Sequence, residues 1–187
     1  MAFQFWTRNS SRTKRILTIV AFFILSLIVT VAGALTPLTA EEVTEITDEM
    51  EKMRENVSSA GAFGGTAFIF GNNFILCLSF FIPVVGPFFG CYVLYSTGVV
   101  IAAESISVKV SPILSFLLLF IFPFTWLEFL AYSTALAQSI WLTWRIIQRK
   151  GRRELVNTCI MISICAVTLF VAAVIEVALI QALGSLI

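Results

Sequence analysis

Long apolar runs separated by short polar stretches make up most of the chain. A run of about 20 apolar residues is long enough to cross the hydrocarbon of a bilayer as a helix. The runs predict transmembrane helices at about 16–38, 66–85, 89–104 and 155–186. A further run, 112–144, is too long for one straight span and is divided by Pro123. We therefore expect either a re-entrant half-helix over 112–122 followed by a span, or one long kinked helix.

The stretch 39–60 has a different pattern, in which apolar residues recur at three- and four-residue spacing among acidic ones. Thr39 and Glu42 have the spacing of a capping box, which marks the start of a helix. The pattern predicts an amphipathic acidic helix outside the hydrocarbon. One interpretation is a solvated connector whose apolar edge packs on the membrane domain. The other is a docking surface for a partner protein, formed by Glu41, Glu42, Glu45, Asp48 and Glu49.

Composition agrees with an all-α polytopic membrane protein of about five transmembrane helices, with membrane lipids as its main surroundings. Apolar residues make up 59% of the 187 residues and charged residues 12%, whereas soluble domains are about half apolar and a quarter charged. The absence of histidine excludes histidine metal sites and histidine acid–base chemistry. The four cysteines lack the paired spacing of zinc ligands, so we expect no metal and no cofactor.

The distribution of charge predicts the orientation. Residues 1–15 contain four basic residues and 145–153 contain five, and such segments face the cytoplasm. A cleaved signal peptide competes as an explanation of the N-terminus, but the apolar run that follows is too long for a typical one. We therefore expect a cytoplasmic N-terminus over 1–15 and one membrane domain over 16–187 in the cell membrane. Five crossings place both helix 39–60 and the C-terminus outside.

Four polar residues within apolar runs are the candidate functional residues: Asn72, Asn73, Glu128 and Glu176. At about 1.5 Å per residue, Glu128 lies roughly 25 Å from Arg145 along its helix, and Glu176 roughly 34 Å from Arg153. Both carboxyl groups should therefore lie in the outer half of the membrane and can meet the two amides. Such residues are costly in hydrocarbon. A structural polar lock, a proton or cation site, and exposure of Glu176 to water at the interface all remain open.

Three motifs in this region resemble the stage II sporulation protein M family of integral membrane proteins. The segment 69–73 looks like that family's asparagine-containing second helix. Residues 123–131, with Glu128, are similar to its Pro-His-Gly-x-x-Glu-x-x-Ala motif, although Phe124 and Thr125 stand where the family has His-Gly. Residues 172–176 look like its closing Ala-x-Ile-Glu motif. The resemblance covers about residues 65–180 and implies a five-helix membrane protein.

The resemblance also implies a function. The namesake of the family belongs to a membrane complex that recruits peptidoglycan-remodelling enzymes and is not thought to be a hydrolase itself, while relatives occur in organisms that do not sporulate. We therefore expect a non-enzymatic scaffold or accessory subunit that acts through membrane or extracytoplasmic proteins. The alternative is a small proton- or ion-coupled transport component that uses Glu128 and Glu176, with homo-oligomerisation possible. An enzyme ranks last because no nucleophile–base pair is evident, and nucleic-acid binding is not supported.

Overall fold

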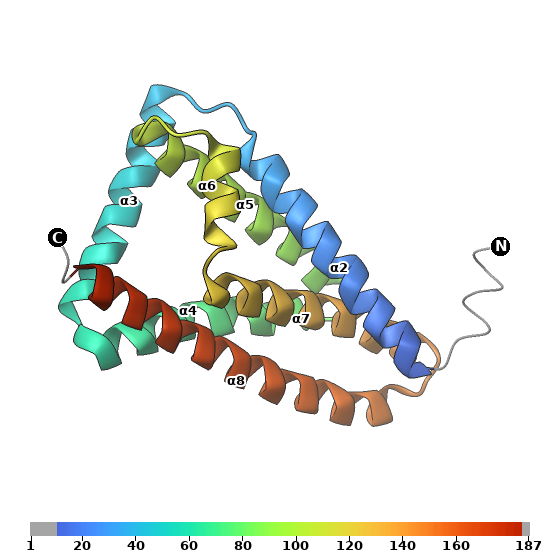
Figure 1. The fold of residues 1–187 in the computed structure, drawn as a ribbon. Coiled ribbons are helices and arrows are strands. Elements are labelled where there is room, and N and C mark those ends of the chain that lie inside the picture. Colours follow the sequence, from blue (N-terminus) through green and yellow to red (C-terminus); the bar gives the residue numbers. More distant parts are fainter. Residues whose placement is uncertain (1–10, 185–187) are drawn as a thin grey trace.

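The computed structural model describes residues 11–184, and within them it contains seven helices and no strand (Figure 1). The helices are α2 (Ser11–Ala34), α3 (Ala40–Ser59), α4 (Gly61–Phe80), α5 (Val85–Ser107), α6 (Pro112–Leu119), α7 (Pro123–Ile147) and α8 (Gly151–Gly184). In the described part, α2, α4, α5 and α8 are each long and apolar enough to cross a membrane, and the bent pair α6–α7 provides a fifth candidate span. The predicted class, a polytopic all-α membrane protein, is confirmed.

The helices form two limbs that diverge from one end of the molecule (Figure 1). One limb contains α2 and α5, and the other contains α4, α7 and α8; the helices within each limb pack against one another. The limbs meet where α2 begins and where α7 turns into α8 (Figure 1), and α2 also packs along α7, with Ser26 beside Ser133 and Phe23 stacked on Trp126. At the opposite end α3 bridges the gap between the end of α2 and the start of α4, and α6 descends between the limbs onto α7.

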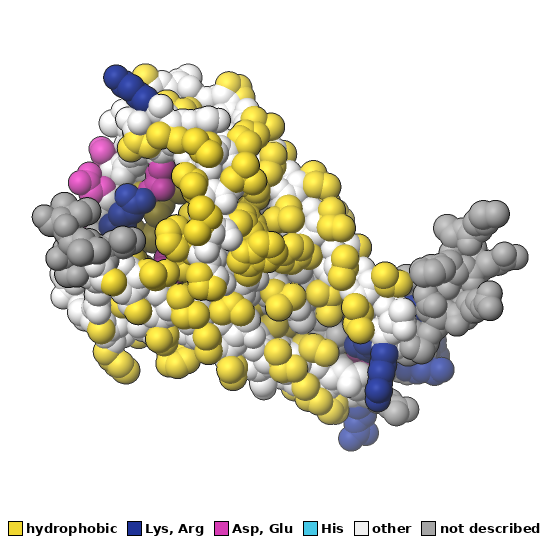
Figure 2. Space-filling view, viewed as in Figure 1, with side chains coloured by type: hydrophobic (Ala, Val, Ile, Leu, Met, Phe, Trp, Pro, Cys, Tyr) yellow, Lys and Arg dark blue, Asp and Glu magenta, His cyan; other side chains and the backbone are white. Residues whose placement is uncertain are grey.

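Apolar side chains cover much of the visible surface of both limbs (Figure 2). Ile75, Val167 and Phe170, for example, point away from the core and are half or more exposed. A soluble monomer rarely shows apolar patches of this extent. Lipid tails are the natural neighbours of such side chains, and the core between the helices is correspondingly small.

Two glycines allow α2 and α5 to cross at very short range. A Cβ atom on Gly98 would overlap the carbonyl oxygen of Thr30, and one on Gly33 would overlap the carbonyl oxygen of Tyr95. Small residues at a crossing let helix backbones approach closely, which is a main source of association between helices in lipid. The hydroxyl groups of Thr36 and Tyr95 lie 2.8 Å apart beside this crossing.

Several helices begin earlier than the apolar pattern predicted. Helix α4 begins at Gly61 rather than near 66, because the positive φ of Gly61, 68°, lets the chain turn directly out of α3. Helix α5 begins at Val85 rather than 89 and takes Pro87 into its first turn, where a proline does not interrupt the hydrogen bonding of the helix. Helix α8 begins at Gly151 rather than 155, since polar residues are tolerated in a first turn outside the hydrocarbon.

The first helix also differs from its predicted bounds of 16–38. It begins at Ser11, within the basic segment, and ends at Ala34. Pro37 disfavours helical geometry in the residue before it, so the chain leaves the helix ahead of the proline and reaches the N-cap Thr39 in extended form. Residues 1–10 of the predicted cytoplasmic N-terminus, and the last residues of the predicted final helix, lie outside the described residues.

The break between α6 and α7 is sharp. The two helices meet at 89° across residues 120–122, which makes them two separate helices rather than one kinked helix. Two side chains from the first turn of α7 satisfy carbonyl groups at the end of α6: Thr125 Oγ1 donates to Leu119 O, and Trp126 Nε1 donates to Phe120 O, both at 2.8 Å. Such partners are needed because lipid cannot bond to free carbonyl groups.

Candidate functional site

Helices α4, α7 and α8 bring three of the four predicted polar residues to one region. The amide Nδ2 of Asn73 on α4 donates a 2.7 Å hydrogen bond to Glu128 Oε1 on α7. Glu176, on α8, lies close enough to Glu128 to interact with it electrostatically, and the hydroxyl of Tyr132 lies within range of both carboxyl groups. Asn72 does not join them, because its side chain is exposed on another face of α4.

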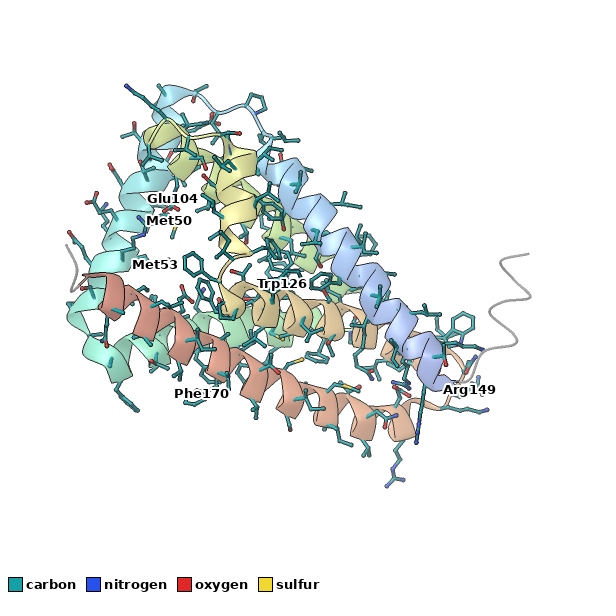
Figure 3. The ribbon with its side chains drawn as sticks, in the orientation of Figure 1. Met50, Met53, Glu104, Trp126, Arg149 and Phe170 are labelled. Carbon is teal, nitrogen blue, oxygen red and sulfur yellow. The ribbon has the colours of Figure 1, made fainter. Side chains whose placement is uncertain are left out.

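The elbow between α6 and α7 positions Glu128. Pro123 is the first residue of α7, where its fixed φ and missing N–H suit a helix start. Trp126 and Phe120 pack edge to face with ring centroids 5.2 Å apart, and Phe23 of α2 stacks on Trp126 at 6.1 Å (Figure 3). These rings and the two hydrogen bonds from Thr125 and Trp126 hold the first turn of α7. Glu128 follows on the next turn and is thereby directed towards Asn73.

A cavity of about 980 Å³ lies between α3, the end of α5 and α6. Most of the residues that line it are polar, including six with a hydroxyl group: Thr47, Ser58, Ser59, Ser105, Ser107 and Ser115. Arg54 of α3 reaches across to Glu104 of α5 and forms a 2.5 Å ion pair at its wall. Met50, Met53 and Glu104 can be located on this side of α3 in Figure 3. The cavity opens at the end of the molecule that carries the acidic helix.

Helix α3 presents its five predicted docking residues to solvent. Glu41, Glu42, Glu45, Asp48 and Glu49 are all exposed, and Val43 is the residue of this helix that is buried. The capping box is present: Thr39 Oγ1 accepts from the backbone N–H of Glu42, and Glu42 Oε2 accepts from the backbone N–H of Thr39 at 2.8 Å. This backbone hydrogen bond lowers the pKa of Glu42 from its ordinary value. None of the five lines the cavity, which α3 faces instead with Glu51, Arg54 and Glu55.

A buried ionic network at the other end of the molecule was not anticipated from the sequence. Arg15 of α2 donates to both carboxylate oxygens of Glu154 on α8, at 2.6 and 2.8 Å, and to Gln138 of α7 at 3.1 Å. Gln138 donates in turn to Glu154 at 2.9 Å and to Thr158 at 3.0 Å. The guanidinium of Arg15 also lies 5.0 Å from the ring centroid of Trp141.

This network joins three helices that are distant in sequence. Glu154 is 3% exposed, yet it is satisfied by Arg15, Gln138 and Asn157, with Arg145 at 3.9 Å. One feature of the sequence could have revealed the network: Glu154 is a single carboxylate at the start of an apolar helix, directly after the basic segment 145–153. An acidic residue in that position has cations within reach, whereas Glu128 and Glu176 have none near them in sequence.

Comparison with known proteins identifies the family. The model of the stage II sporulation protein M family matches residues 17–179. The chain belongs to the stage II sporulation protein M family. No curated protein and no solved structure matches the chain. In this member of the family, the segments 69–73, 123–131 and 172–176 lie on the three helices that meet at Asn73, Glu128 and Glu176.

The polar residues of the described helices can form hydrogen bonds and ion pairs with one another and with a bound molecule. Within the residues described, no group of three histidine, cysteine, aspartate or glutamate side chains could hold a metal ion. Cys77 and Cys165 are buried in the core and are free thiols, and Cys165 Sγ lies 3.5 Å from the carbonyl oxygen of Ala131. The cluster of Asn73, Glu128 and Glu176 connects α4, α7 and α8, and the cavity presents hydroxyl, carboxylate and guanidinium groups.

Proposed function

We propose that this membrane protein is a non-enzymatic scaffold or accessory subunit that acts through partner proteins. The observation that supports the proposal most directly is the arrangement of α3 and the cavity at one end of the molecule. There an acidic helix stands over a polar cavity, with five carboxylates directed into solvent. The Thr39 capping box closes the first turn of the helix, and α3 is connected to the membrane helices by its packing on α4 and α5 and by the Arg54–Glu104 ion pair. A rigid, charged and exposed element suits recognition of a partner because little conformational entropy is lost on binding.

The test is co-purification in mild detergent with a charge-neutralised helix. In this variant Glu41, Glu42, Glu45 and Glu49 are replaced by glutamine and Asp48 by asparagine. Glutamine at position 42 can still form the capping box with Thr39. The control variant neutralises Glu51 and Glu55, which face the cavity. A stoichiometric partner that is lost from the first variant but kept by the control supports the proposal, provided that both variants keep the thermal stability of the parent. An unchanged profile of co-purifying proteins contradicts it.

The location and orientation belong to the same proposal. We place the protein in the cell membrane with its N-terminus cytoplasmic and α3 outside, because the basic segments and the acidic helix lie at opposite ends (Figure 1). Single cysteines at Ser58 and Gln148, in a background without Cys77, Cys91, Cys159 and Cys165, would be labelled in intact cells with an impermeant thiol reagent. Labelling of Ser58→Cys alone is expected. Labelling of Gln148→Cys from outside would reverse the orientation.

The second candidate is a proton- or ion-coupled transport component. It is favoured by the carboxyl groups of Glu128 and Glu176 beside a helix pair broken at 89°, since interrupted helices and intramembrane carboxylates are common in transporters. Purified protein in liposomes containing a pH-sensitive dye would be compared with Glu128→Gln. Proton flux that disappears in a stably folded Glu128→Gln variant supports transport. Proton flux at the background level in both proteins contradicts it.

A further inference from the structure

One corner of the molecule carries cations that nothing in the described chain neutralises. It lies where α2 begins and where α7 turns into α8, and dark blue side chains gather there in Figure 2. The side chains of Arg12, Arg149, Lys150 and Arg152 are exposed and form no ion pair with any described residue. Arg149 stands at the tip of this corner in Figure 3.

The one acidic residue near these cations is already engaged. Glu154 is the only aspartate or glutamate within the segments 11–30 and 130–170 that form this end of the molecule. Its carboxylate is buried and bound by Arg15 at 2.6 and 2.8 Å, with Arg145 at 3.9 Å. The four exposed cations therefore have no anionic partner among the described residues and are available to anions from outside the chain.

Arg149 and Lys150 lie in the turn between α7 and α8, and Arg152 lies in the first turn of α8. The turn has a defined backbone. Arg149 has a φ of 58°, in the left-handed region, and its N–H donates to Ile146 O at 2.9 Å. The N–H of Lys150 donates to Arg145 O at 2.9 Å. These two bonds close the end of α7 in the manner of a C-terminal capping motif. The cations are thus presented at a fixed place rather than on a loose loop.

Exposed apolar side chains surround the cations. Trp144 is 56% exposed and Ile147 71%, just before the turn, and Val156 is 61% exposed just after it. Tryptophan is favoured at the level of lipid headgroups, where its ring meets both apolar and polar surroundings. Cations beside such a surface fit a molecule with a negatively charged head and an apolar tail.

We propose that this corner is a binding site for the headgroup of an anionic phospholipid. The phosphate lies among Arg149, Lys150, Arg152 and Arg12, and the acyl chains lie along the exposed faces of Trp144, Ile147 and Val156. Each cation near an anionic membrane surface strengthens binding roughly fivefold. This site is independent of the function proposed above, since it shares no residue with α3, with the cavity, or with the cluster at Glu128.

The test is a lipid titration of the full-length protein in detergent, followed by native mass spectrometry. Dissociation constants for the first bound phosphatidylglycerol and the first bound phosphatidylcholine would be compared. The parent protein is expected to prefer phosphatidylglycerol at least tenfold. The variant Arg149→Gln/Lys150→Gln/Arg152→Gln should lose most of that preference. The control Lys52→Gln/Lys109→Gln removes exposed cations outside this corner and should keep the preference.

Two further measurements on the parent protein complete the test. The preference should fall as salt rises from about 50 to 500 mM, because exposed charges are screened over a shorter distance. Glycerol phosphate at millimolar concentration should not displace phosphatidylglycerol, since it lacks acyl chains. Equal binding of the two lipids, or loss of the preference in the control, would overturn the proposal. Displacement by glycerol phosphate would show a simple anion site instead.

Discussion

Arg15 and Glu154 are separated by 139 positions in sequence and meet in a two-point contact, with Arg15 Nη2 at 2.6 and 2.8 Å from the two carboxylate oxygens. The contact ties the start of α2 to the start of α8, and Gln138 joins α7 to both. The two limbs of the molecule therefore share one buried network at the end where they meet.

Removal of one partner from this pair should be costly. Arg15→Leu leaves the Glu154 carboxylate buried without its main cation, for which a loss of about 3–5 kcal/mol is typical. Arg145, at 3.9 Å, can offset part of that loss. Thermal unfolding in detergent would measure the change. The double variant Arg15→Leu/Glu154→Leu should lose less stability than the sum of the single variants. Arg12→Leu, at an exposed cation without a partner in the described chain, is the matched control; a loss there as large as in Arg15→Leu would contradict the prediction.

The two neighbouring asparagines of α4 provide a sharp test of the polar cluster. Asn73→Leu removes the donor to Glu128 and should lower the free energy of unfolding by about 0.5–2 kcal/mol, the range of hydrogen bonds between membrane helices. Asn72→Leu, at an exposed position, should change it little. Glu128→Leu should destabilise as Asn73→Leu does, while Glu128→Gln should preserve assembly because an amide oxygen can still accept. Equal losses at Asn72 and Asn73 would show that this hydrogen bond contributes little.

The elbow between α6 and α7 should depend on the hydroxyl of Thr125. Thr125→Val keeps the shape of the side chain but removes one of the two donors to Leu119 O, the other being the backbone N–H of Phe122 at 3.1 Å. The expected cost is about 0.5–1.5 kcal/mol, the net contribution of one hydrogen bond. Thr134→Val is the control, since the hydroxyl of Thr134 bonds to Leu130 O within its own helix. Spin labels on α6 and α7 would report the angle between the helices by the distance distribution. A narrow, unchanged distribution in a fully stable Thr125→Val protein would disprove the role of this bond.

The crossing of α2 and α5 should tolerate no side chain at Gly98. An added Cβ would overlap Thr30 O and lie 2.7 Å from Ala34 N, both backbone atoms that cannot rotate away. Gly98→Ala should therefore force the helices apart and cost about 1–3 kcal/mol, as overpacking usually does. Gly71→Ala is the matched control because nothing lies within 4 Å of its added Cβ. Comparable unfolding temperatures for the two variants would mean that the crossing can relax.

The sequence by itself determined the class of the protein, its approximate spans and its family. Hydropathy over 20-residue windows depends only on local composition, so the apolar runs could be located without knowledge of their neighbours. The capping box at Thr39 was also predictable, because its two partners are three residues apart. The break at Pro123 followed from the chemistry of proline, although the angle of 89° did not.

Contacts between helices were decided only by the tertiary structure. Asn72 and Asn73 are indistinguishable by hydropathy and depth, and the rotation of α4 directs only Asn73 towards Glu128. Apolar spans carry little signal for rotation, since lipid and core are equally apolar. For the same reason the sequence did not reveal that Arg15 pairs with Glu154. It also did not reveal which face of α3 meets the cavity, where its charged residues are Glu51, Arg54 and Glu55. Pairing across more than 100 residues depends on how the helices pack, which local patterns do not record.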